Sequence, residues 1–203
     1  GDEPVNDPGA VCYGPNGEVL LTEQEINFAV SELVVNALRS RGYTVDLMEE
    51  FDERLEGYQA TALISIHAND CSEYRNVDGS LVSAFLVSQA QDRPEGGQDS
   101  RLRECVANEY GNITNLERRF SLTRDMQDYH IFREIDVRTP GVIIEIGFML
   151  GDQNLLVNQP DLVAQGVING LLCFLEGEML TVPNATAIPS DAIGTEPTAT
   201  PMP

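Results

Sequence analysis

The pentapeptide Ser65-Ile66-His67-Ala68-Asn69 combines an imidazole, a hydroxyl and an amide at the end of an apolar run. The run Ala62-Leu63-Ile64 precedes it, and the polar residues 70–73 follow it. A strand that ends in this way delivers its histidine to the edge of the sheet at which α/β proteins bind ligands. The chain contains only 2 histidines, and neutral imidazole is a common zinc ligand. His67 is therefore the first candidate for a metal or catalytic site.

Two glutamates are candidates for the same site as His67. Glu145 interrupts the apolar residues 142–148, where a carboxylate is costly unless it is paired or lies at a metal ion. Glu23 stands in the first turn of a predicted helix, where a carboxylate also simply complements the helix dipole. One histidine and two carboxylates suit a metal site in which one carboxylate takes a proton from water.

Elements of alternating type surround these residues. Thr22 begins a predicted helix with Glu25 as its capping-box partner, and Gly42 ends it. Residues 1–21 are rich in glycine, proline, asparagine and aspartate and are predicted to be loop. Periodicity predicts strands over 43–48, 62–66, 81–88 and 141–146, a short polar helix near 52–58, and helices over 100–113 and 160–176. This order indicates a single α/β domain with a mixed, mostly parallel sheet flanked by helices.

Composition indicates the extent of the domain and limits the classes of partner that it can bind. We expect a catalytic domain over residues 1–177, followed over 178–203 by a tail or linker rich in proline, threonine and alanine, which is typical of disorder. The net charge of −21, from 33 acidic and 12 basic residues, argues against binding to nucleic acid. No apolar stretch approaches the roughly 20 residues that a membrane-spanning helix needs.

The 4 cysteines contain no C-x-x-C pair, which argues against a thiolate zinc site. Cys12, Cys71 and Cys105 fall in or beside polar segments, whereas Cys173 lies in the apolar residues 171–175 and is expected to be a buried thiol. We hypothesise a disulfide between Cys71 and Cys105, which export of the protein would favour.

Three ordered blocks of the chain resemble the zinc-dependent N-acetylmuramoyl-L-alanine amidases, bacterial cell-wall hydrolases with an α/β fold. The blocks are Glu-Gln-Glu-Ile-Asn-Phe-Ala at 23–29, Ser-Ile-His-Ala-Asn at 65–69 and Pro-Gly-Val-Ile-Ile-Glu-Ile-Gly-Phe at 140–148. The second and third blocks are specific in this order, whereas the first is weak alone. The resemblance extends from about Asn6 to Leu175, nearly all of the predicted domain.

The resemblance implies hydrolysis of the amide between N-acetylmuramic acid and the L-alanine of the stem peptide in peptidoglycan. The family holds one zinc ion with two histidines and a glutamate. By resemblance, Glu23 and His67 are two of these ligands, and Glu145 is the catalytic glutamate that activates the zinc-bound water. The resemblance also implies an exported protein that is periplasmic, cell-wall associated or extracellular.

Three further residues are expected on the substrate side of the site: Asn69, His130 and Arg133. His130 lies shortly before the strand that carries Glu145, and a single histidine without a partner is more often structural or a substrate contact than a metal ligand. Arg133 suits a stem-peptide carboxylate, although an ion pair with one of the many acids is the simpler interpretation. We expect a monomer that acts on peptidoglycan.

The first zinc histidine of the family has no counterpart in the expected place. In the family it belongs to an Asp-Pro-Gly-His-Gly block that follows an apolar strand, whereas this chain has Asp7-Pro8-Gly9-Ala10. In one interpretation the chain is truncated, because the family often carries a second Asp-Pro-Gly-Ala segment and residues 1–5 are not apolar enough for the first strand. In the other, Ala10 replaces the histidine and the protein binds no metal. We favour truncation, with the third ligand upstream of residue 1.

Three functions follow from these alternatives. The leading hypothesis is a zinc amidase that is impaired in this chain by the loss of one histidine ligand. The second is a non-catalytic homologue that binds peptidoglycan or regulates another enzyme and keeps the groove without the metal. The third is a zinc peptidase that uses the same ligands on a peptide bond not attached to sugar.

Overall fold

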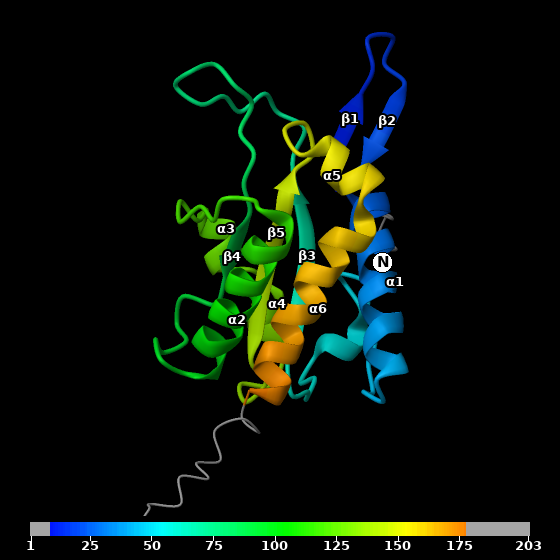
Figure 1. Cartoon of the computed structure of the whole chain (residues 1–203). Coiled ribbons are helices and arrows are strands. Elements are labelled where there is room, and N and C mark those ends of the chain that lie inside the picture. The colour runs from blue at the N-terminus through cyan, green and yellow to red at the C-terminus, as the bar shows by residue number, and fades with distance from the viewer. Residues whose placement is uncertain (1–8, 178–203) are drawn as a thin grey trace, which may run out of the picture.

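Strand β5 (Gly141–Phe148) is the central strand of a small mixed sheet. In the computed structural model, which describes residues 9–177 (Figure 1), it lies between β3 (Leu63–Asn69) and β4 (Leu86–Ser88). β3 runs parallel to β5, and β4 runs antiparallel to it. Seven of the eight residues of β5 are buried, as expected for a strand that is covered on both faces. The predicted single α/β domain with a mixed sheet is confirmed.

Three helices cover one face of this sheet: α1 (Glu23–Ser40), α2 (Gln98–Thr114) and α6 (Pro160–Glu176) (Figure 1). Their apolar residues share one core with β5 side chains that are 0% exposed, those of Val142, Ile144 and Ile146. Thr22 and Glu25 form the predicted capping box at the start of α1. The helices predicted from periodicity are therefore confirmed within two residues at each end.

The opposite face of the sheet is covered by shorter elements. These are η1 (Glu53–Leu55), α3 (Arg124–Gln127) and α4 (Ile131–Glu134), whose Phe132 shares an apolar cluster with Ile143 of β5. Helix α5 (Gln153–Asn158) follows β5 and leads into α6. His67 and Glu145 lie on this less covered face, because their neighbours Ile66 and Ile144 belong to the core on the helical face.

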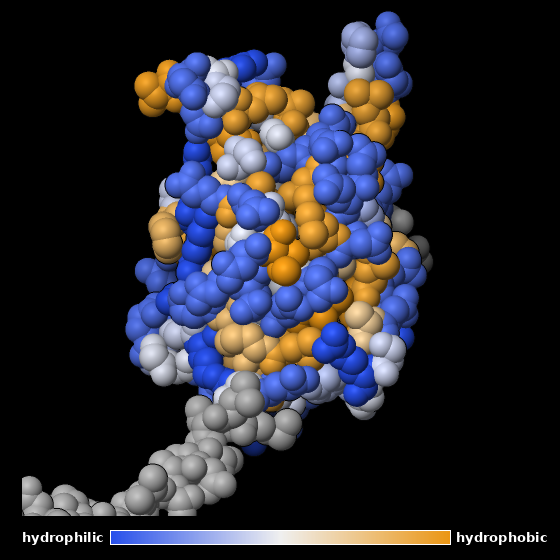
Figure 2. Space-filling view, in the orientation of Figure 1, coloured by the Kyte–Doolittle hydropathy of each residue, from blue (hydrophilic) through white to orange (hydrophobic). Residues whose placement is uncertain are grey.

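Residues 1–21 were predicted to be loop, and this is wrong for their second half. Strands β1 (Val11–Tyr13) and β2 (Val19–Thr22) form an antiparallel hairpin, because branched and aromatic residues flank a turn with Gly17 at a φ of +82°. The hairpin projects from the domain, as does the loop over 70–82, and both projections carry apolar surface in Figure 2. The exposed apolar side chains there are those of Tyr13, Val19, Leu20, Tyr74 and Val77.

Two predicted strands and one predicted helix are shorter than expected or missing. Residues 43–48 form no strand, because no backbone hydrogen bond joins them to a neighbouring strand among the described residues. The strand over 81–88 shrinks to β4, with isolated bridges at Leu81 and Phe85. The helix near 52–58 is the single turn η1. The tail over 178–203 lies outside the described residues.

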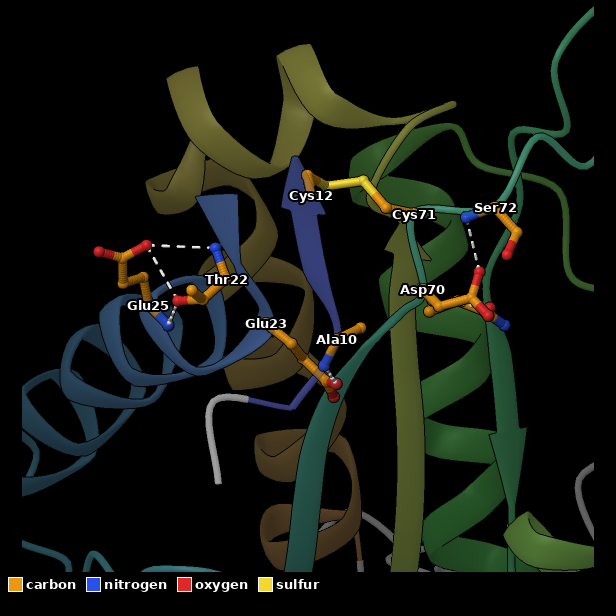
Figure 3. Close-up of a disulfide and its surroundings, with 9 residues drawn as sticks. Ala10, Cys12, Thr22, Glu23, Glu25, Asp70, Cys71 and Ser72 are labelled. Atoms are coloured by element: carbon orange, nitrogen blue, oxygen red, sulfur yellow. Dashed lines mark hydrogen bonds between the residues drawn. A yellow bond between two sulfur atoms is a disulfide. The ribbon is translucent and has the colours of Figure 1, made fainter. Parts of the chain in front are cut away.

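The disulfide hypothesis was wrong in its pairing, and the expectation that Cys173 is a free thiol was wrong as well. Cys12 of β1 is bonded to Cys71 after β3, with Cα atoms 5.4 Å apart (Figure 3), and Cys105 of α2 is bonded to Cys173 of α6, with Cα atoms 5.6 Å apart. The hairpin brings Cys12 to the end of β3, and the packing of α6 on α2 brings Cys173 to Cys105. Two disulfides are typical of exported proteins. No helix within residues 9–177 is long and apolar enough to cross a membrane.

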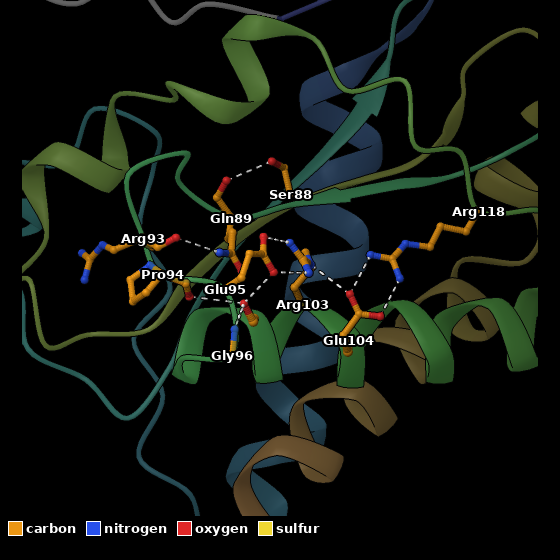
Figure 4. A network of polar contacts seen from close by, with 10 residues as sticks. Ser88, Gln89, Arg93, Pro94, Glu95, Gly96, Arg103, Glu104 and Arg118 are labelled. Atoms are coloured by element: carbon orange, nitrogen blue, oxygen red, sulfur yellow. Dashed lines mark hydrogen bonds and ion pairs between the residues drawn. The ribbon is translucent and has the colours of Figure 1, made fainter.

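A network of charged side chains fastens the loops on either side of α2 (Figure 4). Arg103 lies 3.0 Å from Glu95 and 2.9 Å from Glu104, and Glu104 also pairs with Arg118 at 2.8 Å. Glu95 and Glu104 are 73% and 46% exposed, so each pair contributes little to stability by itself. The network positions loops and lies apart from His67 and Glu145.

Candidate metal and catalytic site

The register of the sheet brings His67 and Glu145 together. His67 of β3 and Glu145 of β5 are paired residues of adjacent parallel strands, so their side chains stand beside each other on the same face of the sheet. The pairing follows from the register of the two apolar segments, in which residues 63–67 of β3 lie opposite residues 141–145 of β5. The sequence motifs at 65–69 and 140–148 thus meet in space.

Glu23 reaches this pair from the first turn of α1. Its Oε1 lies 3.0 Å from Nδ1 of His67 and accepts hydrogen bonds from Nδ2 of Asn27 at 3.2 Å and the N–H of Ala68 at 3.3 Å. Its Oε2 accepts a hydrogen bond from the N–H of Ala10 at 3.0 Å (Figure 3). The side chains of Glu23 and His67 are only 14% and 18% exposed. The carboxylate is therefore held in place by four partners and not by the helix dipole alone.

Gly9 lies against this carboxylate and has no room for a side chain. Its φ is +64°, and a Cβ atom built there would lie 2.6 Å from Oε2 of Glu23. Only glycine adopts this conformation without strain and permits this approach. The Asp-Pro-Gly-Ala segment therefore supports Glu23 structurally, through the backbone of Gly9 and Ala10.

The second ring nitrogen of His67 is held from the opposite side. Nε2 lies 3.0 Å from Oγ of Ser65 and 2.9 Å from the hydroxyl of Tyr129. Tyr129 also donates a hydrogen bond of 2.9 Å to Glu50. Outer contacts of this kind orient metal-ligating histidines. Tyr129 and Glu50 were missed in the sequence, because an isolated tyrosine before His130 indicates packing and an exposed glutamate indicates nothing specific.

Glu145 has the electrostatic properties of a proton acceptor. Its Oε2 is buried and has no hydrogen-bond partner among the described residues. Burial raises the pKa of Glu145 to about 7, with repulsion from Glu23 and Asp70 adding to the increase and attraction to His67 opposing it. A carboxylate that titrates near neutral pH can both take up and release a proton.

Glu23 and His67 shift each other's pKa in the directions expected of an ion pair. Burial opposes ionisation of Glu23, but hydrogen bonds from His67 and Ala10 outweigh it and lower the pKa of Glu23. Burial likewise disfavours the charged form of His67, but the hydrogen bond to Glu23 and the nearby Glu145 charge raise its pKa. The site therefore attracts positive charge.

The described residues fit part of a zinc site. Glu23 and His67 present an oxygen and a nitrogen to each other at 3.0 Å, and the unpartnered oxygen of Glu145 faces the same side of the sheet. Catalytic zinc sites commonly use three protein ligands and keep a fourth position open. No group of three His, Cys, Asp or Glu residues within 9–177 is placed to hold a metal ion. The described part of the chain therefore does not show a complete set of zinc ligands, and the roles of Glu23 and His67 as ligands stay predictions.

The three residues expected on the substrate side lie in different settings. Asn69 accepts a hydrogen bond of 2.9 Å from the N–H of Asp70. His130 bonds Glu134 at 2.9 Å, and its ring stacks on Phe51 at 5.0 Å. Its Nε2 also lies 3.4 Å from Oε1 of Glu50, which connects it with Tyr129 and so with the site. Arg133 pairs with Asp128 at the surface. Their roles toward substrate stay predictions.

The family model for N-acetylmuramoyl-L-alanine amidases matches residues 5–173. The chain belongs to this family. The match includes Glu23, His67 and Glu145, and it confirms the resemblance of the three motif blocks. The family is zinc-dependent.

Solved structures of amidases share the fold of this domain. The CwlD amidase from Clostridioides difficile in complex with the GerS lipoprotein is 18% identical, covers 86% of this chain and 95% of its own, and has a TM-score of 0.61. The amidase AmiC2 of Nostoc punctiforme is 21% identical, covers 83% and 94%, and has a TM-score of 0.58. The catalytic domain of CwlV from Bacillus (Paenibacillus) polymyxa var. colistinus is 20% identical, covers 85% and 93%, and has a TM-score of 0.60.

Two curated proteins show similarity over a shorter range. Both are named 3-phosphoshikimate 1-carboxyvinyltransferase. The one from Citrobacter koseri is 29% identical over 139 residues, which cover 65% of this chain and 31% of that protein. The one from Serratia proteamaculans is 30% identical over 130 residues, which cover 61% and 28%. The matched region spans less than a third of the length of each of these relatives. Their name is therefore that of much longer proteins and is not carried over to this chain.

Proposed function

We propose that this domain hydrolyses the amide bond between N-acetylmuramic acid and L-alanine in peptidoglycan when its zinc site is complete. The observation that carries this proposal is the convergence of Glu23, His67 and Glu145 on one face of the sheet in a member of the amidase family. Residues 1–203 alone are expected to hydrolyse the bond only feebly, because they supply two of three ligands. We further propose an exported monomer that acts in or near the cell wall.

The residues of the domain have separate tasks in this proposal. Glu23 and His67 would hold the zinc ion, with Ser65 and Tyr129 fixing the ring of His67. Zinc, when bound, polarises an amide carbonyl and lowers the pKa of water towards about 7. Glu145, whose buried Oε2 has no partner among the described residues, takes a proton from water and passes it to the departing amine of L-alanine.

The third ligand is proposed to lie upstream of residue 1, since Ala10 has no ligand atom in its side chain and its N–H is bound to Glu23. The alternative is a non-catalytic homologue that binds peptidoglycan without zinc. The incomplete set of ligands among residues 9–177 is the observation that favours it. Binding to peptidoglycan that does not depend on zinc, in the polypeptide produced from the native start codon, would support the alternative.

Product analysis on purified muropeptides tests the proposal. The zinc-loaded polypeptide from the native start codon should release intact stem peptide with a free L-alanine amine. Glu145→Gln should lose this activity and keep its zinc, whereas Glu32→Gln on the exposed side of α1 should keep both. Cleavage inside the stem peptide would instead identify a peptidase. An active Glu145→Gln variant would contradict the role given to Glu145.

Elemental analysis after metal loading separates the ligands from their surroundings. His67→Ala should lose zinc, and His130→Ala, which removes the other histidine of residues 1–203, should retain it. Retention of zinc by His67→Ala would contradict the assignment of His67 as a ligand.

A further inference from the structure

One covalent bond fastens the β1–β2 hairpin to the sheet: the disulfide between Cys12 and Cys71, here called the hairpin disulfide. The hydrogen bonds of the hairpin are internal, apart from the capping box that links Thr22 to α1. Among the described residues, no hydrogen bond joins positions 11–21 to β3, β5 or the loops beyond α1. A two-stranded hairpin by itself is only marginally stable, so the hairpin disulfide is the main restraint on its position.

Apolar packing adds little to this attachment. Cys12 is buried against the core, and Ala10 and Leu21 are half-buried beside it. The larger side chains of Tyr13 and Leu20 are more than half exposed. Because burial of apolar area is what packing contributes, the hairpin gains little from the rest of the domain once the covalent bond is removed.

The hairpin disulfide connects the two backbone segments that hold the carboxylate of Glu23 (Figure 3). Cys12 follows closely after Ala10, whose N–H donates to Oε2 of Glu23 at 3.0 Å. Cys71 follows closely after Ala68, whose N–H donates to Oε1 at 3.3 Å. The carboxylate therefore bridges two segments that the hairpin disulfide holds together.

The start of α1 depends on the same hairpin. Thr22 is the last residue of β2 and also the N-cap of α1, and its hydroxyl accepts a hydrogen bond from the N–H of Glu25. The first turn of a helix frays when its cap is lost. Movement of the hairpin therefore affects Glu23 twice, through the N–H of Ala10 and through the turn that carries the side chain.

The second disulfide has no such connection with the site. It joins Cys105 of α2 to Cys173 of α6, and these helices also pack against each other without it. A Cβ atom at Gly170 of α6 would lie only 2.6 Å from Cα of Val106 of α2, which shows how closely the two backbones approach. This α2–α6 disulfide is thus a natural control for the hairpin disulfide.

We propose that the hairpin disulfide is a redox switch, whose reduction releases the hairpin and frees the carboxylate of Glu23 from its place beside His67. The reductant is a dithiol. One of its thiolates attacks Sγ of Cys71, which is half-buried whereas Cys12 is buried, and the S–S bond breaks with Cys12 leaving as a thiolate. The second thiol of the reductant then displaces Cys71. The protein gains two electrons and two protons, and the dithiol becomes a disulfide.

The switch would make the position of Glu23 depend on the redox state of the surroundings. In an oxidising compartment, where disulfides persist, the carboxylate is held by both backbone segments. Under reducing conditions it loses one of them. The release depends on neither zinc nor catalysis, whereas any loss of metal affinity that accompanies it rests on the proposed function, in which Glu23 is a ligand.

Amide hydrogen exchange tests the proposal without an activity readout. The sample is the variant Cys105→Ser/Cys173→Ser, in which dithiothreitol can act only on the hairpin disulfide. The amides of Ala10 and Ala68 should exchange at least about tenfold faster after reduction, because both lose the carboxylate that accepts their hydrogen bonds. Slow exchange should return on reoxidation. Val30 lies inside α1, is 0% exposed and should be unaffected.

The converse variant, Cys12→Ser/Cys71→Ser, keeps only the α2–α6 disulfide. Its Ala68 amide should exchange fast before dithiothreitol is added and no faster afterwards. The two disulfides span similar sequence separations of 59 and 68 residues, so their removal should cost similar global stability, and a difference at Ala68 is then local. The unsubstituted protein should show the same increase at Ala68 when dithiothreitol reduces it.

Two results would overturn the proposal. One is unchanged exchange at Ala10 and Ala68 after reduction of the hairpin disulfide, since the hairpin would then stay in place without it. The other is an equal increase at Val30, since the whole of α1 would then have loosened and Glu23 would not have been released selectively.

Discussion

Replacing Glu145 with glutamine should stabilise the metal-free domain at alkaline pH and leave its stability unchanged in acid. Burial raises the pKa of Glu145 from 4.5 to about 7. The native state therefore favours the protonated side chain, and ionisation destabilises the fold as the pH rises. At 1.36 kcal/mol per unit of pKa, this shift corresponds to about 3 kcal/mol. The destabilisation is absent below about pH 4.5, develops between pH 4.5 and 7, and is complete above that range.

The measurement is the free energy of unfolding by urea between pH 4 and 8.5, in buffer that contains a chelator. The chelator matters because a bound cation would favour the ionised carboxylate. The difference between Glu145→Gln and the unsubstituted protein should grow from near zero at pH 4 to about 3 kcal/mol at pH 8. Glu32→Gln on the exposed surface of α1 should show no such trend. A difference that is constant with pH, or a loss of stability at pH 8, would refute the reasoning.

Three other perturbations have expected outcomes. Gly9→Ala should lower the free energy of unfolding by about 1–2 kcal/mol more than Gly17→Ala. Both glycines have a positive φ, but only a Cβ atom at Gly9 would meet a side chain, the carboxylate of Glu23. Urea titration of both variants measures the difference. Tyr129→Phe should weaken zinc binding to the complete site by roughly tenfold, since it removes the hydroxyl beside His67, and competition with a chelator of known affinity reports it. Replacing both cysteines of the α2–α6 disulfide by serine should cost about 4 kcal/mol for a sequence separation of 68 residues, and an unchanged denaturation midpoint would contradict this.

The sequence was sufficient to predict the elements that depend on interactions between residues close together in the chain. The capping box at Thr22 and the helical spacing of apolar residues defined α1, and β5 was evident as an apolar run interrupted by one glutamate. His67 was singled out because it stands at the end of an apolar run, and Glu145 because a carboxylate within such a run is costly unless it is paired or lies at a metal ion. Their proximity followed from the register of β3 and β5, which is set by the same two runs.

The failures concern features that depend on distant partners. Residues 43–48 have the pattern of a strand, yet a strand exists only with a neighbour to bond, and pattern alone does not reveal its absence. The pairing of Cys12 with Cys71 depends on a hairpin that the glycine-rich composition concealed. The contact of Tyr129 with His67 links positions 62 residues apart, and no short motif records it.

The site depends on two structural constraints that can be perturbed separately. The register of β3 and β5 fixes His67 and Glu145 relative to each other. Glu23 is fixed by the start of α1 and by the N–H of Ala10, just before the hairpin that the Cys12–Cys71 disulfide joins to the end of β3. Changes within the sheet should therefore move the histidine and the proposed base together. Changes in the hairpin should displace Glu23 and spare the pairing of His67 with Glu145, which would weaken the proposed metal binding while burial still governs the pKa of Glu145.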